Sequence, residues 1–146
     1  MTFLEAFCDT VIPDTDTPGA GSVRTPSFIQ LVLERSLQPP EMKQLIVETE
    51  AIQADLNEHC GGRFVALGER ERAQVLALID DEVMAPETAA PPKPYATTYR
   101  RLKALTIFGY YTSEVGGSRE LRYELAPGRL DADIPVDPNL RPFSNG

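Results

Sequence analysis

The stretch TPSFIQLVLERSLQPPEMKQL, residues 25–45, decides the fold class. Its start is typical of a helix, because Thr25 can act as an N-cap and Pro26 suits the first helical turn. The apolar residues that follow nearly encircle the helix axis, which predicts a central, well-buried helix that runs to about Leu37. A further helix is expected to begin at the proline pair that starts with Pro39.

The same helical spacing of apolar residues extends in both directions along the chain, and strand-like alternation is hard to find. It predicts a first helix that Pro13 stops, a third helix that ends at Gly61, a fourth that follows Gly68, and a fifth over residues 95–113. Outside the second helix, the residues expected to face inward are Phe3, Leu4, Phe7, Cys8, Val11, Ile12, Met42, Leu45, Ile46, Thr49, Ile52, Leu56, Cys60, Val75, Leu76, Leu78, Ile79, Val83, Tyr99, Leu102, Leu105 and Thr106.

Two proline-containing segments lie outside this helical pattern. The segment APETAAPPKP, residues 85–94, holds four of the 13 prolines and is predicted to be a loop. Residues 129–146 combine prolines with aspartates and are predicted to lie extended on a surface. The sequence therefore predicts an all-α fold: a compact bundle of about five helices over residues 1–128, with an extended, proline-containing C-terminal arm over residues 129–146.

Composition narrows the classes of function. The chain has 14 basic and 22 acidic residues and a formal net charge of −8, which argues against nucleic acid as a partner because phosphates attract lysine and arginine. Its apolar runs are far shorter than the roughly 20 residues that a membrane span needs. Met1 is followed at once by TFLEAFCDTVIP, so we expect either a protein that stays in the cytoplasm or one whose export signal has been removed.

His59 is the only histidine and therefore the first candidate for catalysis. It lies in NEHCGG at an expected helix end, where a polar or cationic residue simply suits the helix C-terminus. Its neighbours Glu58 and Cys60 point to other helix faces, and no nucleophile elbow accompanies it. A zinc site is disfavoured as well, because no second cluster of ligand residues stands at the required spacing.

The segment DTDTPGAG, residues 14–21, partly resembles a calcium-binding loop, which alternates carboxylates and turns at a glycine. However, Pro18 takes a position where a ligand is expected, and Thr25 stands where the bidentate glutamate should be. The favoured interpretation is a turn between two helices, in which aspartate and threonine side chains bond the backbone.

Cys8 and Cys60 are a candidate disulfide. Both lie at helix positions expected to face inward, so their side chains could meet in the core. A bridge would contribute about 4 kcal/mol in the chain-entropy model, and it would require an oxidising compartment. In a reducing compartment, the same two cysteines would be buried apolar filler.

The segment LTIFGYYTSEVGG, residues 105–117, ends the fifth predicted helix with two tyrosines, two hydroxyls and a carboxylate. Adjacent helical residues point about 100° apart, so one of Tyr110 and Tyr111 can pack inward while the other faces out. Tyrosine is enriched at interfaces, which favours a partner-binding surface. A helix end that pins the following loop onto its own domain is favoured equally, and an active site ranks third.

The two distinctive segments together carry a resemblance. DTVIPDTDTPGAG, residues 9–21, and LTIFGYYTSEVGG followed by LRYELAPG, within residues 105–128, resemble the gluconate 2-dehydrogenase subunit 3 family. The resemblance implies a small, non-catalytic subunit of a periplasmic sugar or polyol dehydrogenase that carries no cofactor itself. It implies as partners a large FAD-containing flavoprotein of the glucose–methanol–choline type and, in some complexes, a cytochrome c subunit with haem c. It also implies an escort role in twin-arginine export.

The resemblance and the residue patterns together lead to a hypothesis about partner contacts. The turn, the end of the fifth helix and the arm are expected to form them, through Asp14, Asp16, Thr17, Pro18, Tyr110, Tyr111, Thr112, Ser113, Glu114, Leu130, Ile134, Leu140 and Phe143. Two alternatives remain. One is a dedicated export chaperone that leaves the mature enzyme, and the other is a small independent enzyme that uses Glu114 and a tyrosine as acid and base.

Overall fold

The computed structural model describes residues 1–84, 91–123 and 143–144 of the chain. Over this part the fold is all-α, as predicted. The elements, in chain order, are α1 (Phe3–Val11), α2 (Thr25–Ser36), α3 (Pro39–Cys60), the 3₁₀-helix η1 (Phe64–Ala66), α4 (Glu69–Met84), α5 (Ala96–Tyr111), the π-helical turn η2 (Gly116–Glu120), and the strands β1 (Arg122–Tyr123) and β2 (Phe143–Ser144).

The two short strands pair in parallel, with Arg122 opposite Phe143. Phe143–Ser144 is the only portion of the predicted arm within the described residues, and its backbone is extended. Leu130, Ile134 and Leu140 lie outside the described residues. So do residues 85–90 of the predicted proline-rich loop, while residues 91–95 are irregular or turn.

Local chemistry sets most of the helix ends where the sequence predicts them. Thr2 and Glu5 form a reciprocal capping box at the start of α1, with the Thr2 N–H donating to the Glu5 carboxylate at 2.6 Å. The helix ends before Pro13, as expected. Gly61 ends α3 with a φ of 63°, a left-handed conformation that favours glycine.

The start of α2 differs from the prediction by one residue. The N-cap is Arg24, whose φ is 62°, and Thr25 is the first helical residue. The Thr25 N–H donates to the carbonyl of Ala20 at 3.0 Å, because the preceding turn closes onto the helix. The Thr25 side chain is therefore buried, and its hydroxyl has no hydrogen-bond partner among the described residues.

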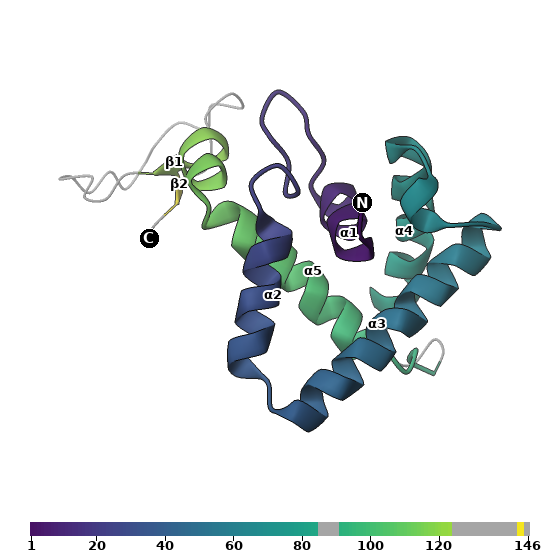
Figure 1. Cartoon of the computed structure of the whole chain (residues 1–146). Helices are drawn as coiled ribbons and strands as arrows, with labels where there is room; N and C mark the ends of the chain where they lie inside the picture. Colours follow the sequence, from purple (N-terminus) through teal and green to yellow (C-terminus); the bar gives the residue numbers. More distant parts are fainter. Residues whose placement is uncertain (85–90, 124–142, 145–146) are drawn as a thin grey trace.

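α2 is not the central helix that the sequence predicts. α5 contacts all four other α-helices, and Figure 1 shows α1 between α2 and α4. Only one face of α2 is buried: Ile29 and Leu33 lie in the core, whereas Leu31 is 46% exposed. Counting the apolar residues around α2 overestimated its burial, because α2 lies at the periphery and is covered on one side only.

Two other residues predicted to face inward point to solvent for the same reason. They are Ile46 of α3, which is 49% exposed, and Leu78 of α4, which is 50% exposed. Each lies beside the buried stripe of its helix rather than within it.

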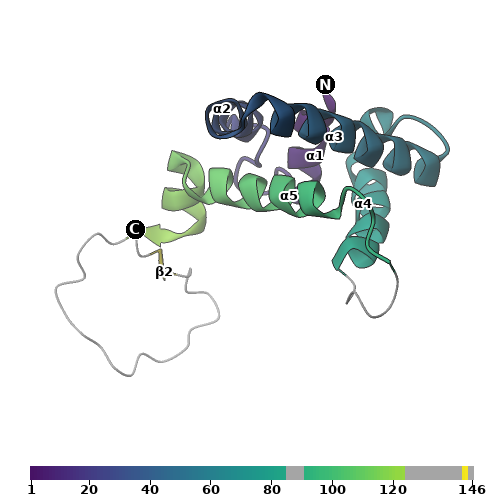
Figure 2. The same cartoon turned by 90° about the horizontal axis from the view of Figure 1, so that it is seen from below.

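The core joins α1 to α5 directly. Phe7 is fully buried and packs edge-on against Tyr99, with ring centroids 5.6 Å apart. The Tyr99 hydroxyl donates to Asp80 of α4 at 2.8 Å, so this polar group has a hydrogen-bond partner although its ring is buried in the core. Burial and this hydrogen bond raise the pKa of Tyr99. Figure 2 shows that α5 runs alongside α3 and ends at η2, away from α4.

Within the described residues, no helix is long and apolar enough to cross a membrane.

Candidate interaction site at the carboxyl end of α5

The two adjacent tyrosines at the end of α5 have opposite environments, as their helical positions predict. Tyr110 is 1% exposed and packs into the domain, whereas Tyr111 is 40% exposed. Their rings are edge-to-face, with centroids 5.2 Å apart. Tyr110 therefore anchors the helix end to its own domain, while Tyr111 presents an aromatic ring to the surface.

A single carboxylate joins this helix end to the N-terminal turn. The hydroxyls of Thr17 and Tyr110 both donate to Oε1 of Glu120 in η2, the latter at 3.3 Å. Burial raises the pKa of Tyr110, and the negative charge of Glu120 adds to this effect although the Thr17 hydroxyl opposes it. The two segments that carry the family resemblance therefore meet in space, through a residue that neither the periodicity nor the motifs singled out.

The Asp14–Gly19 turn is held by its own side chains. The Asp14 carboxylate accepts a hydrogen bond from the Gly19 N–H and another from the Ser22 hydroxyl at 3.0 Å. Asp16 points to solvent, and Pro18 is half-buried. Within the described residues, no group of three or more His, Cys, Asp or Glu side chains is placed to hold a metal ion. The arrangement is the side-chain-bonded turn that the sequence favours.

The hydroxyls of the cluster serve the helix end. The Thr112 hydroxyl donates to the Phe108 carbonyl at 2.7 Å, and the Ser113 hydroxyl donates to the Tyr110 carbonyl at 2.6 Å. Ser113 also accepts from the Gly116 N–H at 3.1 Å, so it links α5 to η2. Glu114 is exposed. Thr112 and Ser113 therefore supply hydrogen-bond donors to backbone carbonyls at the C-terminus of α5.

An apolar groove beside Tyr111 was missed by the sequence analysis. We call it the α5 groove; it has a volume of about 480 Å³ and is lined by Ala104, Ile107, Phe108, Tyr111, Thr112 and Leu121. Phe108 is 58% exposed and Ile107 is 41% exposed. Four of the lining residues, Ala104, Ile107, Phe108 and Tyr111, recur at spacings of three and four away from the inward stripe of the helix. This pattern could have indicated the groove from the sequence.

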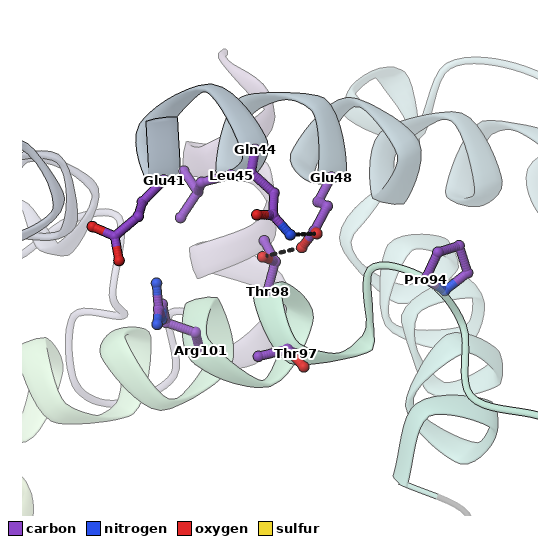
Figure 3. Close-up of a pocket in the computed structure, with 8 residues that line it drawn as sticks. All are labelled: Glu41, Gln44, Leu45, Glu48, Pro94, Thr97, Thr98 and Arg101. Atoms are coloured by element: carbon purple, nitrogen blue, oxygen red, sulfur yellow. Dashed lines mark hydrogen bonds between the residues drawn. The ribbon is translucent and has the colours of Figure 1, made fainter. Parts of the chain in front are cut away.

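A second hollow lies between α3 and the start of α5 and is mainly polar (Figure 3). It has a volume of about 280 Å³. Glu48 accepts hydrogen bonds there from Thr98 at 2.5 Å and from Gln44 at 2.8 Å, and these bonds lower its pKa. Among the described residues, its lining includes the hydroxyls of Thr97 and Thr98 but no histidine or cysteine, and the Thr98 hydroxyl already donates to Glu48. The hollow is a polar seam that links α3 to α5.

His59 belongs to a charged network near the start of α5, away from the α5 groove. Its Nδ1 lies 3.2 Å from Oδ1 of Asp55, one turn earlier in α3. The ammonium of Lys93 bridges Asp55 and Glu82, with both N–O distances at 2.9 Å. The Tyr95 hydroxyl also donates to Asp55. The network ties the segment before α5 to α3 and α4, so the arrangement accounts for His59 structurally.

The expected bridge between Cys8 and Cys60 is not formed, and both cysteines are free. Cys8 faces α5, where its sulfur lies 3.5 Å from the Thr106 hydroxyl. The Cys60 thiol instead donates to the Asn57 carbonyl of its own helix end at 3.4 Å. Inward-facing positions on two helices therefore did not bring these two side chains together.

These features define a class of protein: a small helical domain with an open, largely apolar groove beside the carboxyl end of α5, where the hydroxyls of Thr112 and Ser113 are occupied in helix capping. The chain belongs to the family described as gluconate 2-dehydrogenase subunit 3, which it matches over residues 1–128. Membership confirms the resemblance and implies an accessory subunit of a dehydrogenase complex. No curated protein and no solved structure matches the chain significantly.

Proposed function

We propose that this chain is the non-catalytic small subunit of a periplasmic sugar or polyol dehydrogenase. It binds and stabilises a large FAD-containing flavoprotein of the glucose–methanol–choline type, and it accompanies the folded flavoprotein during twin-arginine export. The observation that carries the proposal is the family match over residues 1–128. The exposed apolar surface at the end of α5 supports it, because surfaces of this kind favour association with another protein.

In this proposal, the redox cofactors belong to the partners. FAD resides in the large subunit, and haem c resides in a cytochrome c subunit where the complex has one. The residues of this chain do not fit either group: the two cysteines are 52 positions apart rather than in a haem-attachment motif, and the glycines at Gly19 and Gly21 follow a helix rather than a strand. The chain therefore contributes binding and stability, while the partner performs the oxidation.

A tagged pull-down from the native host tests the proposal. Visible absorption should reveal a flavin, and mass spectrometry should identify a large dehydrogenase in equal amount. Substoichiometric or absent chain in the mature enzyme would favour the dedicated export chaperone instead. Turnover by the isolated chain, lost when Glu114 is replaced by glutamine, would favour the independent enzyme. A colourless, solitary protein would contradict the permanent-subunit role.

A further inference from the structure

We propose that the α5 groove, extended by Phe28 of α2, is the face on which the chain docks to an apolar, neutral-to-basic surface of its large flavoprotein partner. This proposal rests on the proposed function, and it specifies which surface performs it. Three features support this docking face: the apolar chemistry of the groove, the ordered packing of its side chains and the net charge of the chain.

The groove is uncharged and exposed. None of its six lining residues carries a charge, although 25% of the residues in the chain are charged. Ile107, Phe108 and Tyr111 together expose an aliphatic and two aromatic side chains on one helix surface. Contiguous apolar surface of this kind costs free energy in water, so it marks a place that another molecule covers.

The exposed rings are held in place by their neighbours. Phe108 packs against Phe28 with ring centroids 6.1 Å apart, and Tyr111 packs against the buried Tyr110. Aromatic side chains that are already ordered lose little conformational entropy on binding, which is why they often dominate the affinity of protein interfaces. The face is therefore prepared for a protein partner.

A small molecule fits the groove poorly. Its lining offers only two hydroxyl groups, those of Tyr111 and Thr112, and the second already donates to the Phe108 carbonyl. Small-molecule sites enclose most of the ligand's surface and fix its orientation with a small number of free polar groups, whereas this groove is open and has, among the described residues, one free hydroxyl.

A second copy of the chain is disfavoured by net charge. Each copy carries a formal net charge of −8, so two copies repel each other. A neutral or basic surface on the large subunit avoids this repulsion. Because a stable interface buries about 800 Å² on each partner, residues around the groove are expected to take part in the contact.

The test compares two variants that add the same charge at different exposed apolar positions. Phe108→Asp changes the groove, whereas Val47→Asp changes α3, where Val47 is 64% exposed. Binding of each variant is measured against the large FAD-containing subunit that co-purifies with the wild-type chain. We expect Phe108→Asp to weaken binding at least about tenfold and Val47→Asp to change it by less than about twofold. Tyr111→Ala should weaken binding without loss of helicity, which circular dichroism checks.

Each outcome bears on one claim. If the wild-type chain binds no flavoprotein, the proposed function fails. If the wild type binds and Phe108→Asp binds equally well, the docking face is wrong while the proposed function stands. A wild-type dimer that Phe108→Asp makes monomeric would assign the groove to a second copy. Failure of the isolated wild-type chain to bind an apolar dye, such as anilinonaphthalene sulfonate, would mean that the chain already covers its own groove, which would also overturn the proposal.

Discussion

Replacing Gly109 with alanine should destabilise the domain, although alanine is the better helix former. A Cβ atom at this position would lie 2.6 Å from Cδ1 of Phe28 and 3.1 Å from Cγ2 of Thr25. Carbon atoms in contact normally stay about 3.5–4.0 Å apart, so the ring of Phe28 would have to move by about 1 Å. Gly109 is what allows α2 to approach α5 so closely.

The two opposing effects can be compared. Exchanging glycine for alanine within a helix contributes about 1 kcal/mol of stability. Overpacking costs about 1–3 kcal/mol, and the upper part of this range applies because Thr25 and Phe28 of α2 both crowd the new methyl group. The net loss is therefore about 1–2 kcal/mol, which corresponds to a fall in Tm of about 3–6 °C for a domain of this size.

Thermal and urea unfolding, followed by circular dichroism, measure this loss. Gly62→Ala is the matched control, because a Cβ at Gly62 would have no atom within 4 Å, and its Tm should stay the same or rise slightly. Adding Phe28→Leu should make Gly109→Ala less costly, by about 1 kcal/mol in a double-mutant cycle. A higher Tm for Gly109→Ala, or the same loss with and without Phe28, would refute the packing argument.

Two further predictions concern the ionisable groups of the core and of the charged network. In the native chain, a thiol reagent should label Cys60 and spare Cys8, because burial raises the pKa of Cys8 to about 11; two labelled thiols before denaturant is added would contradict this. Asp55→Asn should cost about 1–2 kcal/mol at pH 7 and much less at pH 2. Burial raises the pKa of Asp55, but the hydrogen bonds from Tyr95 and Lys93 outweigh burial and hold it below its usual value. The stabilisation is therefore present above the unfolded pKa near 4 and is lost as the pH falls through the lower folded pKa. Urea unfolding at both pH values measures it, and an equal loss at both would argue against the ionised network.

The ends of the helices were predicted from the sequence more accurately than the burial of their side chains. Pro13, Pro39 and Gly61 act through their own backbone conformations, so their effect is readable locally. The burial of α2 depends on which other helices cover it, and counting apolar residues such as Leu31 does not supply that information. The disulfide prediction was wrong for a related reason: Cys8 packs against α5, whereas the half-buried Cys60 bonds to its own helix end.

The candidate site was partly readable in the same way. The opposite roles of Tyr110 and Tyr111 follow from the helical rotation of 100° per residue. The meeting of Thr17 with Glu120 required the tertiary arrangement, because 103 residues separate the two side chains. The α5 groove was readable in principle, since Ile107 and Phe108 lie off the buried stripe of their helix.

The burial of α1 has a consequence for the order of synthesis. Its central residues, Phe7 and Cys8, are fully buried, and Cys8 contacts Thr106, which lies 98 residues later in the chain. A ribosome adds about 5–20 residues per second, so α1 is complete about 5–20 s before that part of α5 exists. During this interval α1 can pack against α2 and α4, but the side of Cys8 that faces α5 stays uncovered. Synthesis of α5 therefore completes the protection of α1 from aggregation.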